Sequence, residues 1–166
     1  MTVKRYSYDV FRLSAYGFVA GFLATLTVHQ FALWLLRMAA IAPFGPYNMA
    51  ATEPWGVPAV VSLAFWGGVW GVLFAFVQRG FPRGRRYWTT AFFFGAVLPS
   101  LVALFIVLPA KGRPMGGGWH WQLLLTAFLI NGVWGLGTGA LLRWRIEKPE
   151  RLSHDQPECR PGMICS

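Results

Sequence analysis

The chain has 166 residues, of which 55% are hydrophobic and 17% aromatic, while only 13% are charged. Soluble domains usually carry about 25% charged residues, so this composition argues against a water-soluble globule. The charges are also unbalanced, because 15 Lys and Arg residues face six Asp and Glu residues, for a formal net charge of +9. In a hydrophobic chain this excess is typical of the cytoplasmic rim of a membrane domain, and no nucleic-acid partner is expected.

Four long stretches of the sequence contain no Asp, Glu, Lys or Arg. They cover residues 15–36, 57–77, 90–110 and 121–142. Each is as long as the ~20 apolar residues that a helix needs to cross a hydrocarbon core of ~30 Å. Only helices satisfy their own backbone in lipid over such lengths. The sequence therefore predicts an all-α protein, an integral membrane four-helix bundle over residues 15–146. A cytoplasmic arm (1–14) precedes the bundle, and a disordered cytoplasmic tail (147–166) follows it.

The Lys and Arg residues outside these stretches gather on one side of the predicted bundle. Twelve of them fall in the N-terminal arm, in the loop after the second stretch and in the tail, against three on the other side. Because Lys and Arg are enriched in cytoplasmic loops, both termini are expected in the cytoplasm. The loop cluster is expected to contact anionic lipid headgroups. It consists of Arg79, Arg83, Arg85 and Arg86.

Residues 62–71 align without gaps on residues 126–135, at an offset of 64. Both segments contain the run Gly-Val-Trp-Gly. The first and third stretches match only at Phe18/Phe92 and Gly21/Gly95, at a different offset. The alignment suggests a duplicated two-helix hairpin, with the copies parallel about an axis along the membrane normal. A chance match in a chain rich in Gly, Val and Trp is the alternative.

Glycines recur at helical spacing in three of the four stretches. Helices in lipid associate by close packing of small residues, so these faces are expected to point into the bundle. Trp66, Trp70 and Trp134 lie near the middle of their stretches and are expected to pack beside the glycines, each with a partner for its indole N–H. The predicted packing residues are Gly17, Gly21, Gly67, Gly71, Gly132, Gly135 and Gly139.

Polar residues inside a membrane are rare and are the first candidates for function. The four stretches hold no full charge, which disfavours an ion-coupled carrier. His29 is expected to lean toward the interior and to bond to a neighbouring helix, with Asn131 as a candidate partner. The candidate polar site comprises Thr25, His29, Ser62, Ser100 and Asn131.

The sequence predicts neither a cofactor site nor a catalytic site. His29 and His120 are weak candidates for haem ligands, because they lie at unequal predicted depths and no c-type attachment motif is present. The spacing of His154, Cys159 and Cys165 matches no compact zinc pattern, so no metal site is expected. No Ser/His/Asp or paired-carboxylate constellation is visible, so the chain is not expected to be an enzyme.

The segment 38–56 is long, nearly uncharged and contains three prolines. Its aromatic residues argue against disorder, and a loop of this length is often functional. Three placements stay open: along the membrane interface, in the mouth of the bundle, or docked on a partner.

The run Pro54–Pro58, continued by Phe65–Gly71 and later by Asn131–Gly135, resembles small uncharacterised four-span proteins of the bacterial inner membrane. The resemblance covers most of residues 15–142 and implies a multi-pass location there, but no activity. Two main functions remain open, and a haem-binding membrane subunit is kept as a remote third. The first is a structural or accessory protein that forms an oligomer or joins a larger membrane complex. The second is an oligomeric channel or transport module with a polar path near His29 and Asn131. The scarcity of polar groups favours the first.

Overall fold

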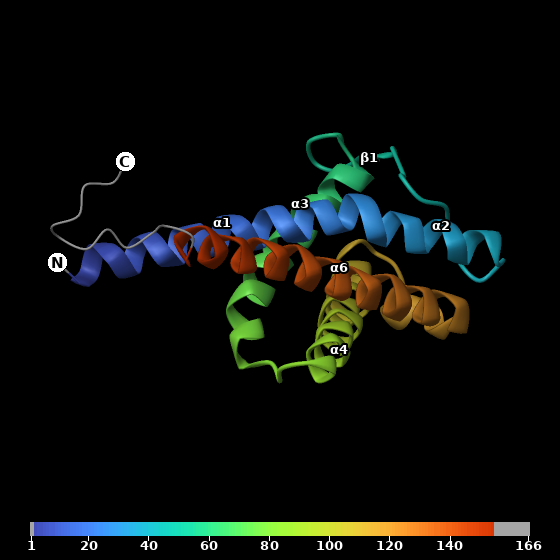
Figure 1. Ribbon diagram of the computed structural model, residues 1–166. Coiled ribbons are helices and arrows are strands. Elements are labelled where there is room, and N and C mark those ends of the chain that lie inside the picture. The colour runs from blue at the N-terminus through green and yellow to red at the C-terminus, as the bar shows by residue number, and fades with distance from the viewer. Residues whose placement is uncertain (1, 155–166) are drawn as a thin grey trace, which may run out of the picture.

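A computed structural model describes residues 2–154, with side chains described for residues 10–144. Figure 1 shows a first long rod formed by three consecutive helical segments. These are α1 (Thr2–Ala24), the π-helical turn η1 (Thr25–His29) and α2 (Gln30–Met38). A loop follows, in which β1 (Ala51–Thr52) pairs antiparallel with β2 (Val57–Pro58). The chain returns through α3 (Ala59–Val77) and the 3-10 turn η2 (Gln78–Gly80).

The second half also begins with an α-helix, a π-helical turn and a further α-helix, but it has a 3-10 turn where the first half has two strands. It comprises α4 (Arg85–Val102), the π-helical turn η3 (Ala103–Val107), the short α5 (Leu108–Ala110), the 3-10 turn η4 (Met115–Trp119) and the long α6 (Trp121–His154). Each half is therefore a rod interrupted by a π-helical turn, followed by an antiparallel helix. We call α1 to η2 the first hairpin and α4 to α6 the second hairpin.

Among the described residues, four helical stretches are long and apolar enough to cross a membrane. They cover Val10–Met38, Ala59–Gly80, Arg85–Ala110 and Trp121–Trp144. The prediction of an all-helical protein with four such stretches is thus confirmed, and the helix ends are the main difference. The third stretch begins earlier than predicted because basic residues, which can extend their charged ends away from an apolar region, fit into its first turn.

The predicted arm and tail also contain helix. The arm is helical from Thr2, and α6 continues to His154, beyond the predicted end of the bundle at residue 146. Arg, Lys and Glu in this extension are good helix formers, whereas Pro149 is not. The rest of the predicted tail, residues 155–166, lies outside the described residues.

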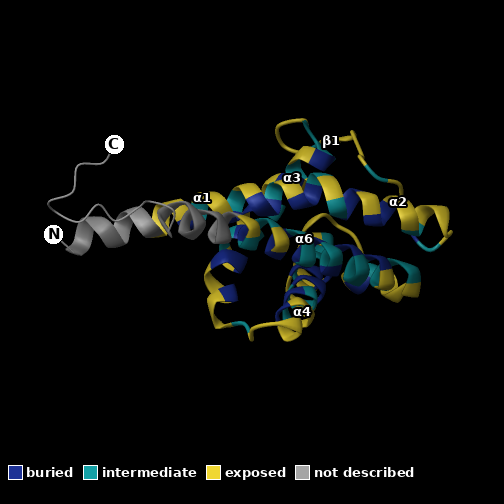
Figure 2. Cartoon of the chain, viewed as in Figure 1, coloured by how far each residue is buried: buried dark blue, intermediate teal, exposed yellow. Residues whose placement is uncertain are grey.

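Burial divides each helix into two faces. In Figure 2 the buried residues line the surfaces between helices, and much of the outer surface is exposed. That outer surface includes large apolar side chains such as Phe11, Trp66 and Ile106, which are 73%, 57% and 61% exposed. Such a surface suits a lipid environment, in which exposed apolar groups carry no penalty.

The first hairpin closes by direct backbone contact between α1 and α3. A Cβ on Gly71 would overlap the carbonyl oxygen of Gly17, and a Cβ on Gly21 would overlap that of Gly67. The ring of Phe18 covers Gly68 on the same interface. The predicted glycine faces of α1 and α3 therefore lie against each other, and even a methyl group would push the two backbones apart.

The second hairpin repeats these contacts between α4 and α6. A Cβ on Gly135 would overlap the carbonyl oxygen of Ala91, and a Cβ on Gly95 would overlap that of Asn131. The ring of Phe92 covers Gly132. Each pair matches one in the first hairpin, at an offset of 74 between α1 and α4 and of 64 between α3 and α6.

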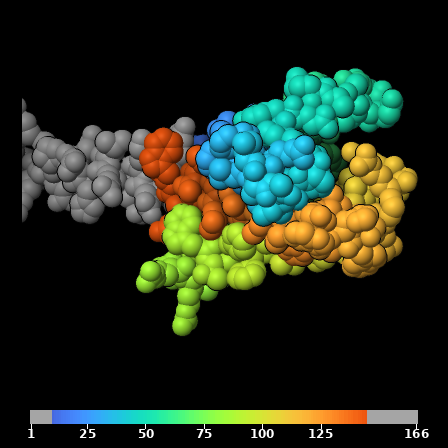
Figure 3. Space-filling view, turned by 90° about the vertical axis from the view of Figure 1, so that its right-hand side faces the viewer, coloured from blue at the N-terminus to red at the C-terminus, as the bar shows by residue number. Residues whose placement is uncertain are grey.

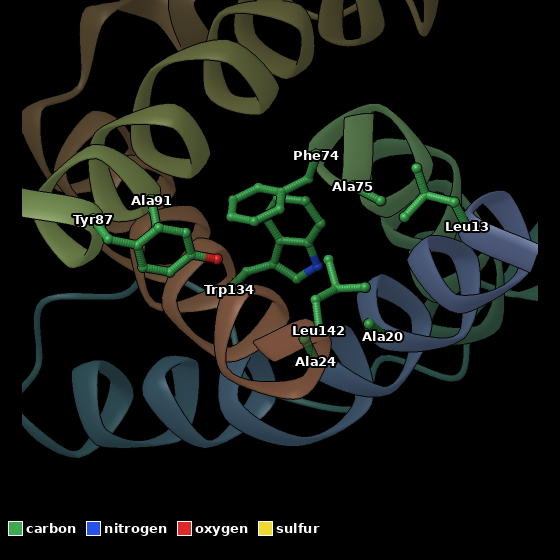
Figure 4. Close-up of a cluster of buried hydrophobic side chains, with 9 residues drawn as sticks. All are labelled: Leu13, Ala20, Ala24, Phe74, Ala75, Tyr87, Ala91, Trp134 and Leu142. Carbon is green, nitrogen blue, oxygen red and sulfur yellow. The ribbon is translucent and has the colours of Figure 1, made fainter. Parts of the chain in front are cut away.

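The two hairpins meet mainly where α1 lies beside α6 (Figure 1). Figure 4 shows Trp134 of α6 between Phe74 and the small residues of α1. Its indole Nε1–H donates to the carbonyl oxygen of Gly21 at 3.0 Å, which supplies the partner that a buried indole needs. Trp70 packs partly buried against the same core, whereas Trp66 faces outward, contrary to the expectation that all three would pack inside.

Candidate functional site

The five candidate polar residues are dispersed over separate helix contacts. Thr25 is buried beside Gly67 in the α1–α3 interface, where its hydroxyl donates to the carbonyl oxygen of Gly21 at 2.8 Å. Ser62 is half-buried near the start of α3. The Gly21 carbonyl also accepts the indole N–H of Trp134, so the Thr25 contact lies where the two hairpins meet.

Ser100 and Asn131 form a polar link between α4 and α6. The Nδ2 amide of Asn131 donates to Ser100 Oγ at 2.9 Å, and Ser100 Oγ donates to the carbonyl oxygen of Ala127 at 3.1 Å. Ser100 follows Pro99, which lacks an N–H and sits inside α4. The link therefore joins the two helices next to the proline.

His29 is buried at the end of the π-helical turn η1, with an exposed fraction of 4%. Its Nδ1 lies 3.3 Å from the side-chain Nε2 of Gln30. The Gln30 Oε1 atom accepts the backbone N–H of Tyr47 at 2.8 Å, which fixes the orientation of the amide. The Gln30 Nε2 can only donate, so His29 Nδ1 is the acceptor and a neutral ring carries its proton on Nε2. The expected partner Asn131 is replaced by Gln30, because Asn131 bonds to Ser100.

Two histidines were considered as haem ligands. One ring nitrogen of His29 lies beside the Gln30 amide. His120, the second histidine considered, is exposed just before α6. Within the described residues, no group of three or more His, Cys, Asp or Glu side chains is placed to hold a metal ion. The side chains of His154, Cys159 and Cys165 lie outside the described residues.

The loop between α2 and α3 folds back along the first rod. The hydroxyl of Tyr47 donates to the carbonyl oxygen of Leu26 at 2.9 Å, and its backbone N–H reaches Gln30. Gln30 lies eight residues before the end of α2, a distance of ~12 Å along a helix. These contacts place the loop alongside the first rod.

A π-helical turn explains why this loop can dock. The wider turn disturbs the regular backbone bonding of the helix, and such turns occur frequently at functional sites. The carbonyl of Leu26 lies within the turn and receives the Tyr47 hydroxyl. This contact could not be predicted from the sequence, since Thr25–His29 has the pattern of an ordinary helix. Gln30 and Tyr47 were therefore missed, although Gln30 stands directly after the histidine singled out as a candidate.

The loop is held by its own hydrogen bonds and leaves its apolar side chains outside. Asn48 accepts the N–H of Ala50 on its side chain and that of Val60 on its backbone, both at 2.9 Å. Met49 and Trp55 are 66% and 86% exposed. In Figure 3 the loop, in teal, stands as a separate lobe on the molecule. It therefore presents an ordered apolar surface.

The opposite end of the bundle carries the basic cluster. Arg79, Arg83, Arg85 and Arg86 are all exposed there. Beside them, Tyr87 donates its hydroxyl proton to Gln78 Oε1 at 2.6 Å, which ties the start of α4 to the end of the first hairpin. The guanidinium of Arg143 lies over the Tyr87 and Trp88 rings, 5.0 and 5.7 Å from their centroids. This end therefore combines packed aromatic rings with exposed cationic side chains.

Two buried hydroxyls stand apart from these networks. Thr126 and Thr138, both on α6, are fully buried, and their Oγ1 atoms have no hydrogen-bond partner among the described residues. An unsatisfied buried hydroxyl is unusual and calls for an explanation.

Comparison of the chain with protein-family models, with curated proteins and with solved structures found no match.

Proposed function

We propose that the chain is a multi-pass protein of the bacterial cytoplasmic membrane, with both termini in the cytoplasm. Its apolar exterior and the four helical stretches among the described residues support insertion. The excess of Lys and Arg on one side supports the orientation. We further propose that it acts as a structural or accessory subunit, as an oligomer or within a larger membrane complex.

The dispersal of the polar side chains is the observation that carries this proposal. Thr25 bonds to its own helix, Ser100 and Asn131 bond to each other, and the pair His29 and Gln30 holds a loop. The Ser100–Asn131 pair fastens two helices and the His29–Gln30 pair holds a loop, and no two of these networks share a residue. A bundle fastened in this way is suited to offer fixed surfaces to partners.

The two ends of the bundle support two kinds of contact. The cluster of Arg79, Arg83, Arg85 and Arg86 is suited to anionic headgroups, with about 1 kcal/mol of attraction for each basic residue near an anionic leaflet. The apolar lobe at the other end is suited to a membrane-protein partner or a second copy. The glycine faces serve contacts inside each hairpin, so a partner would bind elsewhere.

A channel or transport module remains the second candidate. The unpartnered hydroxyls of Thr126 and Thr138 favour it, because a polar solute could satisfy them. If it is correct, the variants Thr138→Val and His29→Ala should change solute flux into liposomes. Flux equal to that of empty vesicles, for the wild-type chain, would remove this candidate.

The matching contacts also lead us to infer that the two hairpins arose by duplication. The pairs Gly21/Gly95 and Phe18/Phe92, which alone are weak sequence matches, occupy the same places at the two helix crossings. A chance repeat of Gly-Val-Trp-Gly would not require equivalent partners on the preceding helix.

The accessory role is tested by isolating the full chain from its native membrane with a polymer that retains surrounding lipid. Mass measurement should then show a homo-oligomer or a partner in fixed proportion. A lone monomer in the native lipid would contradict the accessory role.

The orientation is tested separately with an impermeant thiol reagent, which should label Cys159 and Cys165 only after the inner membrane is opened.

A further inference from the structure

A half-open cleft of about 390 Å³ lies between the end of α2 and the start of α6. Figure 3 shows this end of the molecule, with the end of α2 in cyan beside the start of α6 in orange. The polar lining residues are Arg37 on one side and His120 and Gln122 on the other. Ala42 and Leu123 provide apolar wall, so donors from two elements meet over an apolar surface.

The guanidinium of Arg37 is held at this cleft by a sharp turn. The chain reverses after α2 through Ala40, whose φ of 58° is left-handed, and Leu36 accepts backbone N–H groups from both Ile41 and Ala42. The turn places the Ala42 carbonyl where Arg37 Nη1 donates to it at 3.2 Å. An arginine carries five N–H donors and no acceptor. Apart from the Nη1 donor bonded to Ala42, the N–H donors of Arg37 can therefore bond to a ligand or to solvent.

The opposite wall is positioned by a second unusual turn. Gly116, Gly117 and Gly118 all have φ between 62° and 68°, and Trp119 follows with a φ of 60°. A side chain at Gly117 would overlap Leu123, so glycine lets this turn lie close to the first residues of α6. The turn leads directly into His120. Both polar walls are thus set by backbone conformations that cost energy, and such residues cluster at binding sites.

The positive charge at the cleft indicates that an anionic ligand would bind there. Among residues 10–144, Glu53 is the single acidic side chain, and it does not line the cleft. Arginine supplies a permanent cation, while His120 and Gln122 supply further donors. A planar guanidinium binds phosphate through two parallel N–H···O bonds, which makes arginine suited to phosphate groups.

We propose that this cleft binds a phosphate group through Arg37, His120 and Gln122. The phosphate is carried either by a phospholipid headgroup at that face of the membrane or by a soluble phosphate compound. The half-open shape admits both, because a headgroup can enter while its acyl chains remain outside. This site lies at the end of the bundle opposite Arg79–Arg86, and it does not depend on the accessory role.

The experiment uses the full chain purified in an uncharged detergent and two probes. Mass spectrometry of the intact protein measures retention of phosphatidylglycerol against diacylglycerol, which lacks phosphate. Thermal unfolding in inorganic phosphate, against chloride at equal ionic strength, measures the soluble ligand. Arg37→Gln should weaken phosphate-dependent binding about tenfold or more, as expected for loss of a hydrogen bond to a charged group. Lys111→Gln is the matched control, since it removes one exposed cation near the same end but outside the cleft.

Binding of phosphatidylglycerol but not of inorganic phosphate, lost in Arg37→Gln, would assign the site to a headgroup. Stabilisation by inorganic phosphate, lost in the same variant, would assign it to a soluble compound. His120→Ala provides a second test that leaves the turn around Arg37 intact, and it should weaken the same binding. If both variants bind each probe as the wild type does, or if Lys111→Gln loses as much as Arg37→Gln, the proposal is overturned.

Discussion

The two hairpins cross at equivalent backbone contacts but fill the space around the crossing differently. In the first hairpin, Gly17 and Gly67 stand at positions that Ala91 and Asn131 occupy in the second. Two glycines of the first hairpin are thus replaced, and yet the remaining pairs are still in close contact. The comparison teaches that the geometry of a helix crossing can be kept while its chemistry changes.

One difference is an exchange of a methyl group between helices. A Cβ on Gly17 would lie 2.8 Å from the Cβ of Ala75 on α3. In the second hairpin the equivalent of Gly17 is Ala91, and the equivalent of Ala75 is Gly139. The exchange is not matched by an equivalent contact, because a Cβ on Gly139 would meet the side chains of Tyr87 and Phe74, so the second crossing is packed differently at this place.

The second difference between the two hairpins is how their polar side chains form hydrogen bonds at the helix crossing. Where Gly67 lies against Thr25 in the first hairpin, Asn131 of the second reaches Ser100 on α4. The hydroxyl of Thr25 bonds within its own helix, so that interface rests on backbone proximity. The second hairpin adds a hydrogen bond between helices.

The largest expected loss of stability comes from adding a methyl group at the glycine contact that both hairpins share. Gly71→Ala and Gly135→Ala each place a Cβ against a carbonyl oxygen of the facing helix, so each should cost about 1–3 kcal/mol of unfolding free energy. Unfolding in mixed micelles with increasing SDS measures this cost. Gly80→Ala is the control, because nothing lies within 4 Å of a Cβ there. Clearly unequal costs for Gly71 and Gly135 would show that the two crossings are not equivalent.

The methyl exchange leads to a rescue experiment of the next size. Gly17→Ala should destabilise the first hairpin by about 1–3 kcal/mol. Ala75→Gly should recover only part of that loss, because the added Cβ also lies 2.7 Å from the carbonyl oxygen of Gly71. A double-mutant cycle in the same SDS assay should give a favourable coupling of about 0.5–3 kcal/mol. Additive effects of the two substitutions would mean that the exchange is coincidental.

The polar link should contribute less. Asn131→Ala removes the bond to Ser100, and such bonds between helices in membranes are worth about 0.6 kcal/mol on average. In a Ser100→Ala background, Asn131→Ala should cost almost no further unfolding free energy, since the partner of the amide is then absent. The same cost in both backgrounds would show that Asn131 contributes through packing alone.

The sequence predicted the helices well because burying a charge in an apolar environment is costly. Charge-free runs therefore reveal where the chain can be apolar throughout, as for 57–77 against the observed α3, Ala59–Val77. The ends were less predictable, because Arg85 and Arg86 can begin a helix and still extend toward solvent. Glycine spacing likewise indicated a contact face, since positions four apart share one side of a helix.

The polar contacts could not be predicted in the same way. A bond such as that of Asn131 to Ser100 depends on the rotation of two helices about their axes, which no local pattern specifies. The turn Thr25–His29 adds to the difficulty, because a π-helical turn shifts every later residue around the helix. His29 was assigned correctly to a buried position by its spacing from Gly21, whereas its partner could not be assigned.

The smallest predicted effect concerns the turns that interrupt the two rods. In the first hairpin, Tyr47 bonds to the carbonyl of Leu26 in η1, whereas in the second the ring of Phe105 in η3 meets that of Trp119 edge to face at 5.9 Å. Tyr47→Phe keeps the ring and the backbone bond to Gln30 but removes the hydroxyl. It should cost no more than about 0.5 kcal/mol, the low end for one hydrogen bond, because Tyr47 is 54% exposed.

Hydrogen exchange of the loop between α2 and α3 is the sensitive measurement for Tyr47→Phe. A lost hydroxyl bond should speed exchange in this loop while leaving η3 and the second hairpin unchanged, because each π-helical turn is covered by its own loop. Gln30→Leu, which removes the other anchor of Tyr47, should speed exchange in the same loop further. Faster exchange in both hairpins would instead show that the π-helical turns are coupled across the α1–α6 contact, so that the two halves would no longer count as independently fastened units.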